Sequence, residues 1–553
     1  MRLKFTKLLV ILLVTTGVSS CVQDDNEYYP SYQDETSSQT ESTPNEDPFS
    51  LDVMQEAYNY VTGVQTRSSV DGSPNIQPTH RYIRFAPSNK EQIDALNDKF
   101  SIFNFPLDEE ITTGKNEIID SYDIANKDYF YSVVEYDAEL PDSISYCELS
   151  AIYDPYCTDL ETEQATDIIN TAYAISKYGD ATRANDITPW IPSGTIKVWD
   201  DIASDYVPVE GLVVKVKNSS SPTYRSFVTD ENGYFRATIS FVEDVVYLIE
   251  WKNAGEWVIK FGDTIPAVTV SSSIRTALNL NISPSSKGTY YAATSYRGAS
   301  HYWNYADILG FTAPDMGRPI RIHCYDSESS PTQHYTGVFW PNDSRPETLP
   351  DIEVYCKNRS TIYIIGTTFH ELAHVVHYIA VGQPRYNNIN LSQTIIKESW
   401  AEFIECYLID DYYTYLSSLT GVDYTYRIHN DVYTWCDEYL CYTTYTPDIW
   451  NRQSWTYSPD PELHKYTPLI IDLRDAFNQK RWYSEQGFST TYVPDDNVLI
   501  SDNAVIEELV FTTGTIIGLK NALIDYVENT PNLNFTVSDV ETLFDIYELI
   551  NNN

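Results

Sequence analysis

Residues 370–374 read His-Glu-Leu-Ala-His inside an apolar run that extends from residue 362 to residue 381. Two histidines four positions apart project from one face of a helix, about 6 Å apart along its axis. His370 and His374 can therefore offer two nitrogen ligands to one tetrahedral Zn²⁺ ion. Glu371 follows the first histidine, where its carboxylate can reach a water molecule at the metal without binding the metal itself. The spacing predicts a zinc site with a general base beside it.

The surroundings of this motif favour the same interpretation. Along the apolar run, Glu371 is the only residue with a formal charge. A buried carboxylate and three buried histidines (His370, His374 and His377) cost free energy unless they are paired. A metal ion would pair them, whereas the alternative is a core helix whose histidines are satisfied by ordinary hydrogen bonds. The role of His377 stays open between lining a cleft and simple packing.

A third ligand is expected from residues 397–403, which read Lys-Glu-Ser-Trp-Ala-Glu-Phe. They lie in a second helical pattern, predicted from about residue 392 to residue 411. A catalytic zinc site has three protein ligands and keeps its fourth position for water. Glu398 and Glu402 are one helical turn apart and share a face, so one can bind the metal while the other orients a histidine.

Together, His-Glu-Leu-Ala-His and the later Glu-Ser-Trp-Ala-Glu-Phe resemble the gluzincin group of zinc metallopeptidases. In that group a glutamate on the helix after the active-site helix is the third ligand, which implies Glu398 as the ligand and Glu402 as the orienting residue. The metzincin pattern does not fit, because it requires glycine at position 377 and histidine at position 380. The resemblance implies a zinc-dependent hydrolase that acts on peptides or proteins.

Gluzincins also use a tyrosine or histidine of the helical lobe to stabilise the oxyanion of the tetrahedral intermediate. The resemblance points to Tyr466 for this role, with His464 behind it. The sequence before the zinc helix lacks the acidic amine-recognition motif of related aminopeptidases, which favours an endopeptidase. The rival hypothesis is a surface binding or adhesion lipoprotein with a non-catalytic zincin scaffold. The intact ligands and the intact Glu371 favour the enzyme.

The elements around the motif are consistent with a zincin-like domain over residues 286–553. Three short strands are predicted at residues 320–325, 335–340 and 352–356, directly before the active-site helix. Ser360 is placed to cap this helix, and Gly382 and Pro384 to end it. The chain after residue 392 is mostly helical in pattern, so we expect an α+β catalytic domain with a helical C-terminal lobe.

The N-terminus has the organisation of a secretory signal over residues 1–20, with basic residues before a short apolar core. Val-Ser-Ser-Cys at residues 18–21 resembles a bacterial lipobox, which implies lipidation of Cys21; the alternative is a plain secretory peptide. Acidic residues follow at once, as in surface-exported lipoproteins of Bacteroidetes. Residues 21–50 are polar and predicted to be a flexible tether. We therefore expect a protein held in the bacterial outer membrane by a lipid on Cys21, and exposed on the cell surface.

Two further domains are predicted between the tether and the catalytic domain, so the expected fold class is multidomain. Residues 51–185 alternate helical and strand patterns and predict a small α/β domain. Residues 190–285 contain strand patterns with an Asn-Gly turn at residues 232–233. Their Gly-x-Ile-x-Val and Thr-Asp-x-x-Gly-x-Phe patterns resemble the carboxypeptidase regulatory-like (transthyretin-like) β-sandwich, an all-β fold to which we assign no chemistry.

Composition limits the partners. The net charge of −43, from 36 basic and 79 acidic residues, argues against nucleic acid or an anionic membrane surface as a partner. Besides Cys21 the chain has seven cysteines, an odd number. Cys147 with Cys157, Cys436 with Cys441, and Cys324 with Cys356 could form disulfides in an oxidising compartment, which would leave Cys406 over, although sequence cannot assign the connectivity. The oligomeric state is not predicted.

Overall fold

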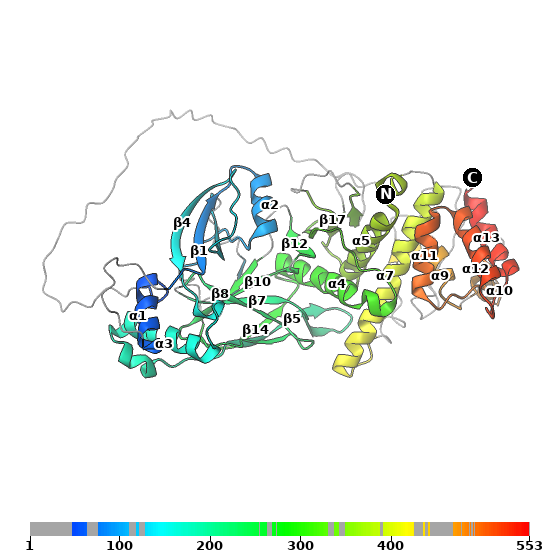
Figure 1. Cartoon of the computed structure of the whole chain (residues 1–553). Coiled ribbons are helices and arrows are strands. Elements are labelled where there is room, and N and C mark those ends of the chain that lie inside the picture. Colours follow the sequence, from blue (N-terminus) through cyan, green and yellow to red (C-terminus); the bar gives the residue numbers. More distant parts are fainter. Residues whose placement is uncertain are drawn as a thin grey trace, which may run out of the picture. The chain divides into compact units, whose positions relative to one another are not determined.

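The computed structural model describes residues 47–63, 76–109, 118–120, 128–219, 221–253, 255–262, 268–271, 274–329, 337–341, 349–387, 391–424, 435–436, 441–442, 468–476, 478–485, 487, 490 and 493–551. These residues belong to one compact unit that extends from Asn45 to Asn553. Helices and sheets of several domains are present, which confirms a mixed α/β, multidomain fold class (Figure 1). The predicted signal peptide, Cys21 and nearly all of the predicted tether lie outside the described residues.

The N-terminal region contains a small antiparallel sheet with helices around it. The strand order is β3-β1-β4, with β1 (His80–Ala86) between β3 (Phe130–Glu135) and β4 (Ser145–Ile152). The helical elements are α1 (Leu51–Thr62), α2 (Lys90–Lys99), η2 (Pro155–Cys157), α3 (Thr162–Tyr178) and η3 (Ala181–Asp186). Phe103 and Tyr131 form an isolated bridge beside this sheet, and the chain bends at residues 104 and 105.

Two sheets follow, and they share one hydrophobic core. The first has the order β2-β13-β10-β7-β8, and the second has the order β14-β5-β6, with β9 also pairing with β5. Val198 of β5, Val216 of β7 and Leu280 of β14 lie in the same buried cluster. This arrangement is compatible with the expected β-sandwich. The strands are β2 (Ile118–Asp120), β5 (Ser193–Asp200), β6 (Asp205–Pro208), β7 (Val213–Asn218), β8 (Tyr224–Val228), β9 (Tyr234–Arg236), β10 (Val245–Glu250), β13 (Val268–Ser271) and β14 (Leu278–Ile282).

The sheet that precedes the helix with the His-Glu-Leu-Ala-His motif has the order β11-β12-β15-β17-β16. Its strands are β11 (Lys252–Asn253), β12 (Trp257–Phe261), β15 (Ile320–Tyr325), β16 (Gly337–Phe339) and β17 (Ile352–Tyr355). β12 pairs in parallel with β15, with Trp257 opposite Ile320. The boundary expected at residue 286 therefore does not separate this sheet from the sandwich region, because residues 252–261 of that region contribute two of its strands.

Four helices that pack on this sheet or on one another surround the candidate site. They are α4 (Lys287–Leu309), α5 (Thr361–Val381), the short α6 (Gln383–Tyr386) and α7 (Leu391–Thr420). α5 packs against both α4 and α7, and it also contacts β16 and β17. Its bounds agree with the apolar run in the sequence, and Gly382 ends it with a positive φ of 76°.

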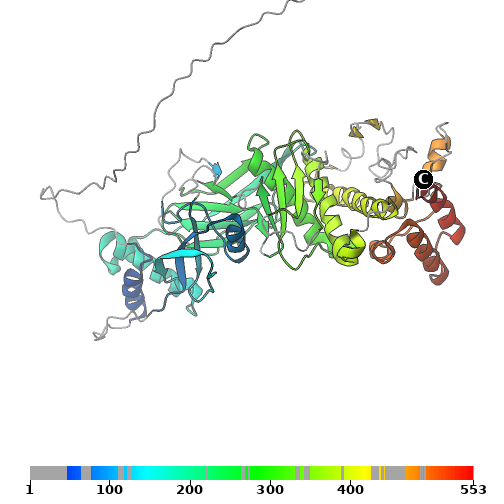
Figure 2. The ribbon, with the colours of Figure 1, turned by 90° about the horizontal axis from the view of Figure 1, so that it is seen from above.

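The described C-terminal helices follow this group along the chain, and three of them contact it (Figure 2). They are α9 (Leu469–Asp472), α10 (Gln479–Glu485), α11 (Asn503–Thr513), α12 (Ile516–Asn529) and α13 (Val537–Asn551). α9 and α12 contact α7, and α11 contacts α5. β18 (Trp435–Cys436) pairs antiparallel with β19 (Cys441–Tyr442). Within the described part of the chain, no helix has the length and apolarity needed to cross a membrane.

Candidate metal centre

Helices α5 and α7 bring the three predicted ligands to one point. Glu398 Oε2 lies 3.5 Å from His370 Nε2 and 3.4 Å from His374 Nε2. The two imidazole rings are 4.9 Å apart between centroids and nearly perpendicular. One donor atom from each residue lies within 4.8 Å of the other two, a spacing that a single metal ion can bridge. The structure thus brings together His370, His374 and Glu398, the metal triad.

The triad is buried, and the pKa values of its side chains are shifted by burial and by one another. His370 is 8% exposed and His374 is 7% exposed. Burial disfavours the charged form of Glu398, but the two histidines hold the pKa of its carboxyl well below the ordinary value. Burial lowers the pKa of His374, whereas Glu398 and Glu405 outweigh burial and raise the pKa of His370 well above its ordinary value; both imidazoles must be neutral to bind a metal. The Glu398 carboxylate therefore supplies the negative charge of the triad.

The histidine-orienting residue is Glu405. Its Oε2 atom lies 3.2 Å from His370 Nδ1, the ring nitrogen that does not face the triad. Glu402, which was predicted for this role, offers a donor atom within 4.8 Å of those of His370 and Glu405, so it belongs to the same polar cluster. Sequence reasoning missed Glu405, although it lies seven residues after Glu398 and therefore on the same helix face. Among the described residues, His374 Nδ1 has no hydrogen-bond partner.

Glu371 lies between the triad and the edge strand β16. The backbone N–H of Phe339 donates a hydrogen bond to its carboxylate. A Cβ atom added to Gly337 would collide with Glu371 Oε1 and with Thr367 Cγ2, so only glycine allows the strand to lie this close. Burial, together with the charges of Glu398 and Glu405, raises the pKa of Glu371 to about 8. A cation bound by the triad would lower this pKa again.

A tyrosine that sequence reasoning did not select also lies beside the triad. Tyr386, at the end of α6, is 6% exposed, and its ring contacts the ring of His374 with a centroid distance of 6.4 Å. Burial and the charges of Glu398 and Glu371 raise the pKa of Tyr386 well above the ordinary value, so its hydroxyl keeps its proton. Tyr466 and His464, the residues predicted to stabilise an oxyanion, lie outside the described residues.

His377 packs beside the metal triad without joining it. Its ring stacks on Phe511 at a centroid distance of 5.3 Å and meets the edge of Tyr386 at 5.5 Å. Burial lowers the pKa of His377 to about 3, and the side chain is 2% exposed. Of the two roles left open for His377, packing is the one that these contacts describe.

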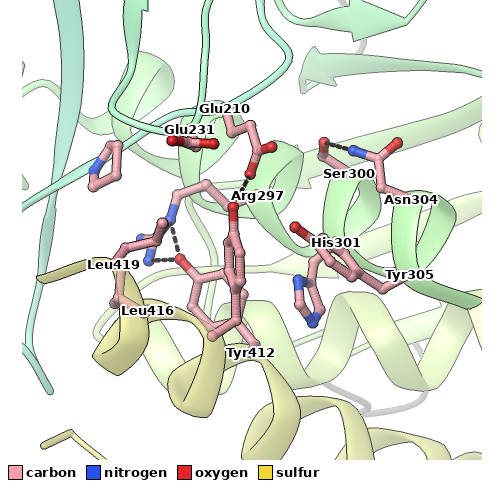
Figure 3. Close-up of a pocket in the computed structure, with 12 residues that line it drawn as sticks. Glu210, Glu231, Arg297, Ser300, His301, Asn304, Tyr305, Tyr412, Leu416 and Leu419 are labelled. Carbon is pink, nitrogen blue, oxygen red and sulfur yellow. Dashed lines mark hydrogen bonds between the residues drawn. The ribbon is translucent and has the colours of Figure 1, made fainter. Parts of the chain in front are cut away.

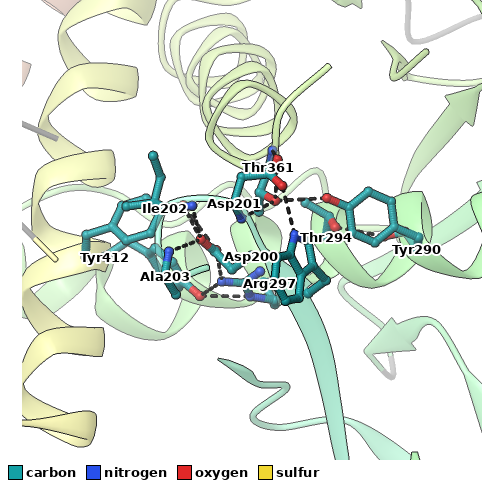
Figure 4. A network of polar contacts seen from close by, with 11 residues as sticks. Asp200, Asp201, Ile202, Ala203, Tyr290, Thr294, Arg297, Thr361 and Tyr412 are labelled. Carbon is teal, nitrogen blue, oxygen red and sulfur yellow. Dashed lines mark hydrogen bonds and ion pairs between the residues drawn. The ribbon is translucent and has the colours of Figure 1, made fainter. Parts of the chain in front are cut away.

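The N-terminus of α5 is fixed by a residue of the sandwich region. Ser360 occupies the N-cap position, as predicted, but its side chain makes no capping hydrogen bond. The carboxylate of Asp201 instead accepts a hydrogen bond of 2.9 Å from the backbone N–H of Thr361 (Figure 4). The hydroxyls of Tyr290 and Thr361 lie 2.9 Å apart, which joins α4 to the same point. Helix α5 is therefore anchored on the end of β5.

The neighbouring Asp200 forms a second, fully buried part of this network. Its Oδ2 atom pairs with Arg297 of α4 at 2.8 Å and accepts a hydrogen bond from Tyr413 of α7 at 3.1 Å (Figure 4). Arg297 Nε in turn donates to the hydroxyl of Tyr412 at 2.8 Å. One strand end thus holds α4 and α7, the two helices that flank α5.

A small cavity of about 30 Å³ lies near this network, between the sandwich region and helices α4 and α7 (Figure 3). Glu210 and Glu231 line one side, and His301, Tyr305 and Tyr412 line another. No residue of the metal triad lines it. The cavity is therefore separate from the candidate site.

Comparison of the sequence with protein-family models gives no match, and comparison with curated proteins gives none either. The residues of the metal triad and their contacts are therefore the basis for a functional proposal. The residue predicted to be lipidated, Cys21, lies outside the described residues.

Proposed function

We propose that the protein is a zinc-dependent peptidase, acting as an endopeptidase, that hydrolyses peptide bonds at the metal triad. The observation that carries this proposal is the position of Glu398 Oε2, 3.5 and 3.4 Å from the Nε2 atoms of His370 and His374. Two ligands on a tetrahedral zinc ion, each about 2.0–2.1 Å from the metal, lie about 3.4 Å apart. Two imidazoles and one carboxylate are also the ligand set of known catalytic zinc sites in peptidases. The residues present therefore fit zinc.

Glu371 is proposed as the general base. When bound, zinc would polarise a water molecule and lower its pKa. Glu371 takes the proton of this water as the water attacks the scissile carbonyl, and then delivers the proton to the leaving amine. The hydrogen bond from the backbone N–H of Phe339 and the contact with Gly337 support this role, since they fix the carboxylate beside the triad.

Two further features support a peptide substrate. β16 is the last strand in the order of its sheet, so an extended peptide can pair with its outer edge next to Glu371. Tyr386 offers a protonated hydroxyl near the triad, and we propose it as the donor that stabilises the oxyanion. Tyr466, expected for this role from the sequence resemblance, remains the alternative donor.

The test separates Glu371 from the ligands. Glu371→Gln should keep the wild-type zinc content, because Glu371 is not a ligand, but should lower kcat by ~10²–10⁴-fold. Glu398→Gln should instead weaken zinc binding, because it removes the charge of a ligand. Zinc content and cleavage of a broad peptide library are measured on the same samples. Unchanged cleavage by Glu371→Gln would refute the peptidase assignment, and a zinc-loaded wild type that cleaves no peptide would favour the surface-binding alternative.

We also propose that the protein is anchored in the bacterial outer membrane by a lipid on Cys21 and faces the medium. The support is the lipobox-like sequence at residues 18–21. Cys21→Ala should move the protein from the membrane fraction to the soluble fraction. Surface accessibility of the wild type is tested by protease treatment of intact cells. A wild type that is already soluble would refute the anchor.

A further inference from the structure

A second group of metal-ligand side chains lies in the N-terminal region, far along the sequence from the metal triad. One donor atom from each of His80, Asp154 and Cys157 lies within 4.8 Å of the other two. Cys157 Sγ lies 3.5 Å from Asp154 Oδ2. We propose that these three residues form a second binding site for a zinc-type ion, the N-terminal metal site. It is independent of the function proposed for the metal triad.

The strand pairing of the small sheet creates this group. His80 is the first residue of β1 and lies opposite Ile152, the last residue of β4. Asp154 follows two residues later and caps η2, whose last residue is Cys157. Asp154 and Cys157, which lie 74 and 77 positions after His80 in the sequence, are thereby brought close to it. This separation explains why the site has no short sequence motif.

The chemistry of the three side chains selects zinc over harder cations. Thiolate, imidazole and carboxylate are all zinc ligands, whereas a thiolate is a poor ligand for calcium or magnesium. An imidazole offers a metal the lone pair of one ring nitrogen, and a donor nitrogen of His80 lies within 4.8 Å of the donor atoms of Asp154 and Cys157. Burial raises the pKa of the Cys157 thiol to about 11, which argues against a reactive thiolate nucleophile. On binding, the metal displaces the thiol proton to solvent.

The surroundings hold the ligands and balance the charge. Thr79 Oγ1 lies 2.9 Å from His80 Nδ1, and Asp154 Oδ1 accepts a hydrogen bond of 3.1 Å from the backbone N–H of Tyr156. Such outer contacts orient ligands in known metal sites. A thiolate and a carboxylate together neutralise a dication.

Two further charges act on this group. Arg225 of β8 pairs with Asp154 Oδ2. Glu135, opposite His80 across the β1–β3 pair, raises the pKa of both His80 and Cys157 and so opposes the effect of Arg225. Because Arg225 belongs to the sandwich region, a metal here would connect β1 and η2 to that region through Asp154.

Cobalt substitution tests the proposal in the full-length protein. Cobalt bound to a thiolate gives a sulfur-to-metal charge-transfer absorption, and the metal triad contains no sulfur. We expect the wild type, kept reduced, to bind two cobalt ions per chain and to show this absorption. Cys157→Ser should lose the absorption and one cobalt ion. Cys147→Ser is the matched control, since Cys147 is also exposed and free but belongs to no such group among the described residues, and it should keep both.

His374→Ala separates this site from the proposed active site. It should lose the metal of the triad and retain the sulfur-to-cobalt absorption. A wild type with one cobalt ion per chain and no such absorption would overturn the N-terminal metal site, and it would leave the peptidase proposal untouched. The cobalt content and absorption of the wild type need no variant, so the test holds even if Cys157→Ser folds poorly.

Discussion

Glu405 Oε2 lies 3.2 Å from His370 Nδ1, across the interface between α7 and α5. The other nitrogen of the same ring faces Glu398. Two carboxylates of one helix therefore bind opposite sides of one imidazole, and the ring orientation is fixed before any metal arrives. Residues that orient a metal ligand in this way are often nearly as important for metal affinity as the ligands themselves.

We predict that Glu405→Gln lowers zinc affinity by ~10–100-fold, because the amide no longer fixes the ring and tautomer of His370. The measurement is competition with a chelator of known affinity. Glu402→Gln, at the position first predicted for this role, is the control and should change the affinity less. A larger effect at Glu402 than at Glu405 would reverse the assignment.

Gly337→Ala should disturb catalysis without disturbing the metal. The added methyl group collides with the carboxylate of Glu371, and a small displacement of a catalytic group can cost ~10²-fold in rate. Zinc content should stay at the wild-type level while kcat falls. Gly298→Ala, on α4, controls for an added methyl group packed against α5. Its added atom would meet Thr368 Cβ at 3.3 Å, away from Glu371. Equal kcat in the wild type and Gly337→Ala would count against the proposed position of the base.

Tyr386→Phe should lower kcat by ~10²–10³-fold, with little change in zinc content, if its hydroxyl is the donor to the oxyanion. Burial keeps this hydroxyl protonated, so the loss should appear throughout the neutral pH range. Tyr466→Phe is the comparison. A large loss with Tyr466→Phe and none with Tyr386→Phe would restore the assignment made from the sequence resemblance.

Asp201→Ala should destabilise the protein by about 1 kcal/mol, the usual cost of removing a capping side chain. The reason is the 2.9 Å hydrogen bond from the N–H of Thr361, which would lose its acceptor. Ser360→Ala is the matched control and should have little effect, because the Ser360 side chain makes no capping bond. Urea unfolding of both variants, with zinc removed, measures the difference. A larger loss for Ser360→Ala would contradict the assignment of the cap.

Acid should weaken the fold through the buried pair of Glu250 and Lys215. Burial opposes the charged carboxylate, but Lys215 and Lys252 hold the pKa of Glu250 at about 2, below its ordinary value of 4.5. The stabilisation is therefore fully present above about pH 4.5 and is lost as the pH falls toward 2, by on the order of 3 kcal/mol.

Urea midpoints measured between pH 5 and pH 2 on metal-free protein test this dependence. Glu250→Gln, which cannot titrate, should be less stable at pH 5 and should lose less stability over the same range. Parallel pH curves for the wild type and Glu250→Gln would show that other groups dominate acid unfolding.

The part of the candidate site that lies within a single helix could be predicted from the sequence. His370 and His374 share a face because of the helical period, and the apolar run around them predicted a buried helix with nearly the observed bounds. Glu398 followed from its resemblance to a known ligand pattern. These predictions depend on spacings of a few residues, which a sequence displays directly.

The contacts between separate helices and strands could be found only in the tertiary structure. Glu405, rather than Glu402, lies 3.2 Å from His370 because of the way α7 packs against α5. The spacing of residues within α7 does not reveal this packing. Gly337 meets Glu371, and Asp201 meets Thr361, only because a strand edge and a strand end pack against α5. Likewise β12 pairs in parallel with β15, although its residues lie within the range predicted for the β-sandwich. Such contacts depend on packing and register between distant segments, and these are set by the folded core as a whole.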